Sequence, residues 1–204
     1  MVQSLPKPTN FAEFIQWKPN NKRYELHEGA IIEMPQPTGE HENIVGFLAE
    51  KLTLEYVRLH LSYSIPKTAL VKSASSESAY SPDILLLDRS NLVNEPFWKK
   101  YSTVTLGKSI PLVIEVVSTN WRDDYYKKYG EYEDIGIVEY WIVDYLALGA
   151  RKFIGNPKKP TISVYFLVDG EYQVNQFQEN ECIQSLVFPE LSLTAEQIFQ
   201  AGVI

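Results

Sequence analysis

The sequence predicts an α/β fold, in which helices flank a mixed central sheet. Short, largely apolar runs at 84–87, 112–117 and 137–143 are rich in β-branched residues, as is typical of buried strands. Two other segments, over about 40–60 and 121–135, have helical patterns. The second helical segment lies between the last two apolar runs, and a strand, a helix and a strand in this order form a right-handed β-α-β unit.

The N-terminal part of the chain predicts a short helix, a hairpin and a long amphipathic helix. Residues 11–17 predict the short helix. The segments 23–27 and 30–34 predict two strands around Glu28-Gly29, which is a turn signal. The long helix, over about 40–60, is predicted by apolar residues at helical spacing: Ile44, Phe47, Leu48, Leu52, Tyr56 and Leu59.

The C-terminal part predicts a second hairpin and a final helix. Residues 161–168 and 171–177 predict two strands joined by a turn at Asp169-Gly170. Thr194 and Gln197 have the spacing of a capping box, which predicts that a helix begins there. Hairpins are therefore predicted in both the N-terminal and the C-terminal part of the chain.

Glu115 is an acidic residue in an otherwise aliphatic strand. Every neighbour from Leu112 to Val117 is apolar, so we expect the strand to be buried on both faces. A buried carboxylate is costly unless something compensates its charge. A buried Arg or Lys, or a raised pKa, would be a structural compensation, whereas a divalent cation would be a functional one. Both explanations are open from the residues alone.

Asp83 is a second acidic residue at the start of an apolar strand. It follows Pro82, which is well tolerated at the first position of a strand. Asp83 could simply cap the strand end as a turn residue. If its strand is the neighbour of the Glu115 strand, however, the two carboxylates could together chelate one Mg²⁺.

The segment after the Glu115 strand predicts a helix with a polar face. Asp124, Lys128 and Tyr132 recur every four residues and therefore share one side of the helix, which ends near Gly136. On an exposed helix, Asp124 and Lys128 would form only a weak surface ion pair. The two acidic strands before it favour a functional interpretation instead.

The order of these motifs resembles the Uma-type family of bacterial endonucleases, in the PD-(D/E)XK or restriction-endonuclease-like superfamily. The Pro82-Asp83 strand, the Glu115 strand and the Asp-Lys-Tyr helix carry the resemblance, together with the Glu-Tyr-Trp-Ile-Val-Asp strand at 139–144. Further similarities are Tyr24-Glu25-Leu26-His27-Glu28-Gly29, Glu33-Met34, His41, Val168-Asp169-Gly170-Glu171-Tyr172 and Pro189-Glu190-Leu191-Ser192-Leu193. The resemblance thus extends along most of the chain.

This resemblance implies a restriction-endonuclease-like α/β/α core with a mixed central sheet and extra N- and C-terminal β-strands, as a single domain over residues 1–204. It implies that Asp83, Glu115 and the carbonyl of Val116 bind Mg²⁺ or Mn²⁺. It also implies catalytic roles for Lys128, for Tyr132, which would position Lys128 or contact phosphate, and for His41.

The chain departs from the superfamily pattern at one position. The motif has Glu-x-Lys on the central strand, but here Val117 occupies the lysine position. We expect Val117 to point toward the site without supplying a charge. By the motif match, the lysine comes from the following helix and is Lys128, with its neighbour Lys127 as the alternative.

His41 lies at the start of the long helix, between Glu40 and Glu42. A single histidine at a helix start is commonly just exposed to solvent. The resemblance includes His41, however, and the superfamily often places an acidic residue of the first core helix near the metal. His41 is therefore a candidate site residue, with the exposed position as the alternative.

The composition is that of a soluble globular domain in the cytoplasm. The 204 residues are enough for one core, and no apolar run approaches the roughly 20 residues of a membrane span. The single cysteine, Cys182, excludes an internal disulfide, and we expect it to be buried or inert. The net charge of −7 disfavours broad, sequence-independent DNA binding, although acidic residues at a metal site contribute to it.

The function predicted from these features is Mg²⁺- or Mn²⁺-dependent hydrolysis of phosphodiester bonds in DNA. Two-fold symmetry matches that of a duplex, so we expect a homodimer, and no membrane partner. The alternative is a non-catalytic module that keeps the nuclease fold and binds nucleic acid or protein. The acidic net charge and the missing Glu-x-Lys favour this alternative, whereas Asp83, Glu115 and Lys128 favour the enzyme.

Overall fold

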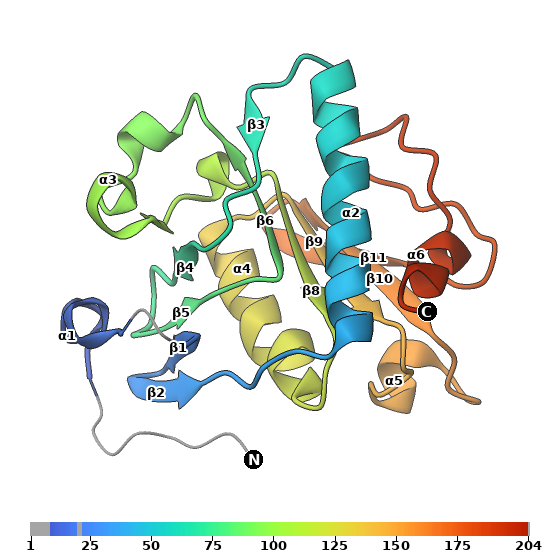
Figure 1. Cartoon of the computed structure of the whole chain (residues 1–204), viewed down its shortest axis with the longest axis horizontal. Helices are drawn as coiled ribbons and strands as arrows, with labels where there is room; N and C mark the ends of the chain where they lie inside the picture. Colours follow the sequence, from blue (N-terminus) through green and yellow to red (C-terminus); the bar gives the residue numbers. More distant parts are fainter. Residues whose placement is uncertain (1–8, 20–21, 204) are drawn as a thin grey trace.

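The strands form two mixed sheets with helices packed around them (Figure 1) in the computed structural model, which describes residues 9–19 and 22–203. Each sheet contains a parallel pair, β8 with β9 and β4 with β7, among antiparallel neighbours. The mixed α/β fold predicted from the sequence is therefore confirmed. The six-stranded central sheet consists, from edge to edge, of β11 (Glu171–Phe177), β10 (Thr161–Val168), β9 (Glu139–Asp144), β8 (Leu112–Val116), β6 (Ile84–Asp88) and β3 (Tyr63–Ser64).

The smaller sheet is built from the N-terminal half of the chain. Its strands, in spatial order, are β2 (Ala30–Glu33), β1 (Tyr24–His27), β5 (Ala79–Tyr80), β4 (Leu70–Lys72) and β7 (Thr103–Val104). The α-helices are α1 (Phe11–Trp17), α2 (Gly39–Arg58), α3 (Trp98–Tyr101), α4 (Tyr129–Ile135), α5 (Arg151–Ile154) and α6 (Ala195–Ala201). A π-helical segment, η3 (Asp123–Lys128), precedes α4, and the 3₁₀ turns are η1 (Leu92–Asn94) and η2 (Gly107–Ser109).

The central sheet lies between two helical layers. Ile114 and Val116 of β8 pack in the apolar cluster that contains the buried face of α2 and α6. Val113 and Val117 belong instead to the cluster on the side of η3 and α4. Because successive side chains of a strand point to opposite faces, Glu115 shares the face of Val113 and Val117 and points toward η3 and α4.

The β-α-β unit predicted around the second helix is confirmed. Strands β8 and β9 are parallel neighbours, with η3 and α4 between them in the chain, and Gly136 ends α4 in a left-handed conformation. The predicted C-terminal hairpin extends the central sheet as β10 and β11. The N-terminal hairpin pairs with β5 in the smaller sheet. A two-residue strand such as β5 is too short for any periodicity to indicate it.

Two further comparisons with the sequence concern Cys182 and the membrane. Cys182 is exposed, so of the two expected alternatives, a buried or an inert thiol, the structure excludes the buried one; the residue lies in an isolated bridge to Thr194 and not in a core strand. Among residues 9–19 and 22–203, the structure contains no helix long and apolar enough to cross a membrane.

Gly107 makes a backbone contact that only glycine allows. A Cβ atom added there would overlap the carbonyl of Gly136 and lie 2.6 Å from the carbonyl oxygen of Ile135, closer than van der Waals contact permits. The clash is with backbone at the end of α4, which cannot move as a flexible side chain can. Gly107 therefore fixes the approach of η2 to the β-α-β unit.

We predict that Gly107→Ala lowers the free energy of unfolding by about 3 kcal/mol, at the upper end of the range for overpacked sites. Urea denaturation measures it. The matched control is Gly46→Ala on the exposed face of α2, where an added Cβ meets nothing within 4 Å. That change removes a helical glycine and is expected to stabilise the protein by about 0.5–1 kcal/mol. Equal effects of the two changes would contradict the close approach.

Candidate functional site

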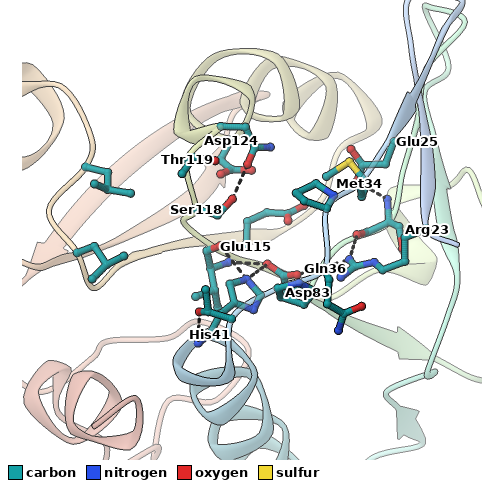
Figure 2. Close-up of a pocket in the computed structure, with 18 of the residues that line it drawn as sticks. Arg23, Glu25, Met34, Gln36, His41, Asp83, Glu115, Ser118, Thr119 and Asp124 are labelled. Carbon is teal, nitrogen blue, oxygen red and sulfur yellow. Dashed lines mark hydrogen bonds and ion pairs between the residues drawn. The ribbon is translucent and has the colours of Figure 1, made fainter. Parts of the chain in front are cut away.

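Strands β6 and β8 bring the two predicted acidic residues together. The antiparallel register pairs Ile84 with Ile114, and its continuation by one residue places Asp83 opposite Glu115. Both side chains line one cavity of about 250 Å³ (Figure 2). The cavity is lined as well by the start of α2, the loop after β8, η3 and the loop after β9. Asp83 and Glu115 therefore share a concave site, as the sequence predicts.

Asp83 is held at the strand end by three neighbours. Its Oδ2 accepts a hydrogen bond from the backbone N–H of Val116 at 2.9 Å and lies 3.2 Å from Nε2 of His41. Among the described residues, the charged neighbour of its Oδ1 is the guanidinium of Arg23, at 3.6 Å. Burial would raise the pKa of Asp83, but His41, Lys128 and the Val116 N–H outweigh it and hold the pKa below its usual value. Asp83 is thus ionised and has one oxygen only loosely engaged.

His41 is buried in the first turn of α2 and points at Asp83, so the exposed alternative is excluded. Thr38 caps this helix and fixes the turn. Nε2 of His41 lies 3.2 Å from both the carbonyl oxygen of Val116 and Oδ2 of Asp83. Nδ1 is buried without a hydrogen bond in the described part of the chain, and its nearest charged neighbour is Glu42 at 3.5 Å. Burial lowers the pKa of His41, but Asp83 and Glu42 raise it above its usual value.

Lys128 is the buried cation of the site. Its side chain is only 3% exposed, and its ammonium lies 2.9 Å from Glu115, 3.1 Å from Asp124 and 3.8 Å from Glu25. Lys127 is half-exposed and pairs with Asp123 on the outside of the helix. Lys127 therefore does not line the cavity. Lys128 does line it, and its ion pair with Asp124 is buried and not at the surface.

Tyr132 and Val117 are on the face of Glu115 but outside the cavity. Tyr132 is fully buried, and its hydroxyl donates a hydrogen bond to Oε1 of Glu115 at 2.9 Å. Of the two roles expected for Tyr132, positioning Lys128 or contacting phosphate, the second does not fit this position, because the side chain is fully buried and does not line the cavity. Tyr132 orients Glu115, which shares its other oxygen with Lys128. Val117 packs in the apolar cluster beside α4, not at the cavity wall as expected.

Three further charged residues line the cavity and were not among the predicted site residues: Arg23, Glu25 and Asp124. Glu25 is fully buried, accepts the N–H of Ser81 at 2.9 Å and lies 2.8 Å from Nε2 of His27. The sequence does contain a signal for Glu25. Glu25 and His27 are two residues apart in a predicted strand, so their side chains point to the same face, and the residues beside them, Tyr24 and Leu26, are apolar or aromatic. Asp124 was recognised only as the helical neighbour of Lys128.

Negative charge exceeds positive charge in the interior of the site. Burial raises the pKa of Glu115 well above its usual value, and Asp83, Asp124 and Glu25 add to the rise against the opposing effect of Lys128. Burial likewise raises the pKa of Asp124 to about 6. The same carboxylates overcome the effect of burial on Lys128 and raise its pKa, so its ammonium stays charged. A further cation in the cavity would relieve this repulsion.

The residues present fit a hard divalent cation. Asp83 Oδ1, the Glu115 carboxylate and the Val116 carbonyl are oxygen donors, which Mg²⁺ and Mn²⁺ prefer. In the described part of the chain, no three Asp, Glu, His or Cys side chains form a ready-made metal cage. Two carboxylates and a carbonyl are nevertheless the kind of set that suits Mg²⁺, because this ion keeps several of its waters.

Comparison with known proteins identifies the relatives of this chain. Residues 11–196 match the family Uma2, described as "Putative restriction endonuclease". The chain belongs to the Uma2 family. A crystal structure described as a "putative nuclease belonging to DUF820" from Anabaena variabilis has the same fold as this Uma2 protein, with a TM-score of 0.74 over 96% of this chain and 100% of the other, at 18% sequence identity. No curated protein matches the chain.

We predict that Lys128→Met lowers the free energy of unfolding of this Uma2 protein by about 3–5 kcal/mol, since removal of one partner leaves buried charges uncompensated. Urea denaturation at neutral pH measures the change. Lys127→Met removes the same charge one residue away from an exposed pair, and we expect a change within about 0.5 kcal/mol. A similar loss in both variants would show that the buried ion cluster contributes nothing specific.

Proposed function

We propose that this Uma2 protein is a divalent-metal-dependent endonuclease that hydrolyses phosphodiester bonds in DNA. The observation that carries the proposal is the convergence of Asp83, Glu115 and the Lys128 ammonium on one cavity. Carboxylates that can hold a metal beside a fixed cation are the groups that phosphodiester hydrolysis needs. The family description supports DNA as the substrate.

Asp83, Glu115 and the Val116 carbonyl would hold Mg²⁺ or Mn²⁺. When bound, the ion would supply activation of water and stabilisation of the leaving oxygen. Nε2 of His41 lies 3.2 Å from both Asp83 Oδ2 and the Val116 carbonyl oxygen, so the ring orients both groups and leaves Oδ1 of Asp83 for the ion. Tyr132 and Lys128 each contact one oxygen of Glu115 and so fix its orientation before any ion binds.

Lys128 would stabilise the negative charge that develops on the phosphate oxygens. Its ammonium is held charged by the surrounding carboxylates and lines the cavity. Lys128 would take the place of the superfamily lysine from the helix, while Val117 on the strand is apolar. Such stabilisation requires an ammonium that is positioned before the substrate binds, and the ion pairs with Glu115 and Asp124 hold the Lys128 ammonium in a fixed position.

We predict that the protein nicks supercoiled plasmid DNA in the presence of Mg²⁺ or Mn²⁺, and that Asp83→Asn abolishes nicking. The amide keeps the shape of the side chain but removes the charge that holds the ion. The matched control is Asp134→Asn, at an exposed position outside the cavity, where the carboxylate accepts a hydrogen bond from the Ser75 hydroxyl at 3.3 Å. Equal nicking by Asp83→Asn and the unsubstituted protein would contradict the assignment and favour the non-catalytic alternative.

Metal binding is predicted independently of activity. A cation that binds only the folded state at a concentration of 100 times its Kd raises the free energy of unfolding by about 2.7 kcal/mol. We expect Mn²⁺ to raise the Tm of the protein and of Asp134→Asn, but not that of Asp83→Asn. Thermal unfolding followed by circular dichroism measures the shift. An unchanged Tm in the unsubstituted protein at saturating Mn²⁺ would exclude a resident ion.

We also propose a homodimer, because cutting both strands of a duplex needs two active sites or two encounters, and two-fold dimers match the symmetry of the duplex. Sedimentation equilibrium at tens of micromolar protein is expected to give twice the 23.4 kDa chain mass. A single monomeric species over the whole concentration range would contradict this assembly without affecting the site.

A further inference from the structure

A second cavity, of about 650 Å³, opens directly beside the candidate site. We call it the lysine groove; it is formed by the end of α1, the start of β1, the start of β4 and the end of α3. Arg23, Gln36 and Ser81 line both the groove and the candidate site. Figure 2 shows Arg23 and Gln36 beside Asp83, so the groove begins where the metal-binding side of the site ends.

The charge of the lysine groove is opposite to that of the protein as a whole. Its wall contains four cations and, among the described residues, no Asp or Glu: Lys18, Lys22, Arg23 and Lys100. The whole chain has a net charge of −7. A concave surface that concentrates one sign of charge against the net charge attracts ligands of the other sign.

Two of the four cations have no anionic partner in the described structure. Lys22 pairs with Glu33 at 2.6 Å, and Arg23 lies 3.6 Å from Asp83. Lys18 and Lys100 form no ion pair with a described carboxylate, and the Lys100 ammonium lies over the ring of Tyr101, 4.9 Å from its centroid. Burial and the charge of Arg23 hold the pKa of Lys18 below its usual value, so an anion between them would remove a repulsion.

We propose that the lysine groove binds the sugar-phosphate backbone of the nucleic acid that leads away from the scissile bond, with Lys18 and Lys100 as phosphate contacts. The proposal rests on the proposed function for the identity of the substrate. An acidic cavity for the cation and a basic groove for the neighbouring phosphates meet at Arg23. A chain with an acidic net charge thereby acquires a local basic footprint for a polyanion.

The test is the salt dependence of DNA binding, measured in EDTA so that no metal-dependent cleavage occurs. Binding of a fluorescein-labelled duplex and of its single strand is followed by anisotropy over a series of KCl concentrations. In the Lys18→Ala/Lys100→Ala variant, we expect weaker binding and a log Kd against log salt slope reduced by about 1.8 for the duplex or about 1.4 for the single strand. The control, Lys99→Ala/Lys108→Ala, removes two exposed lysines outside the groove and should leave the slope unchanged.

Several results would overturn the proposal: no DNA binding by the unsubstituted protein, an unchanged slope in the groove variant, or an equal loss in the control. Displacement of the DNA by inorganic phosphate at the same total phosphate concentration would also overturn it, because the groove would then be a site for small anions. The plasmid assay separates the two proposals. If the groove variant has a reduced salt slope but the unsubstituted protein does not cut plasmid, the groove proposal stands and the nuclease proposal fails. If the unsubstituted protein cuts plasmid but the salt slope of the groove variant is unchanged, the nuclease proposal stands and the groove proposal fails.

Discussion

The candidate site depends on one buried ammonium, that of Lys128. Glu25 belongs to the smaller sheet, Glu115 to the central sheet and Asp124 to the π-helical segment, and each of these carboxylates faces Lys128. The ammonium is therefore the point at which three separately formed elements meet. In a medium of low dielectric constant such a cluster persists only if every charge keeps its partners. Three buried carboxylates need a cation between them, and the Lys128 ammonium is that cation.

The shape of the helix that carries Lys128 is part of the same constraint. The segment Asp123–Lys128 is π-helical before the chain continues as α4. Such bulges are frequent at functional sites, because the wider turn moves side chains away from their α-helical positions. The hydroxyl of Tyr140 on β9 donates a hydrogen bond to the carbonyl of Asp124, at 3.1 Å, and so holds the wide turn against the sheet. Asp124 and Lys128 thus reach the cavity from a segment that the sheet itself supports.

Charge is divided between two adjoining cavities. The candidate site collects carboxylates around Lys128, and the lysine groove next to it contains cations and no described carboxylate. Arg23 lies at the boundary, where it approaches Asp83 on one side and Lys18 on the other. The negative net charge of the chain therefore says little about the surface that faces a substrate, because local arrangement and not the total sets the potential in a cleft.

The sequence by itself determined the central elements and the main candidates. The periodicities identified α2, β8, β9 and the C-terminal hairpin, because a buried strand or an amphipathic helix leaves its pattern in local residue order. Isolated acids in apolar strands identified Asp83 and Glu115, because burial of a charge is costly and needs a reason. The resemblance, and not spacing, selected Lys128 over Lys127, and the burial of Lys128 agrees with that selection.

Only the tertiary structure decided what each side chain faces. Glu25 and Arg23 enter the site because the N-terminal hairpin joins a second sheet beside the first, a long-range pairing that no local pattern encodes. Tyr132 shares a helix face with Lys128, yet packing places its hydroxyl behind Glu115 and outside the cavity. Lys18 and Lys100 line the same groove although they lie far apart in the chain. Contacts of this kind form only when whole elements pack against one another in the folded chain, so no local sequence pattern predicts them.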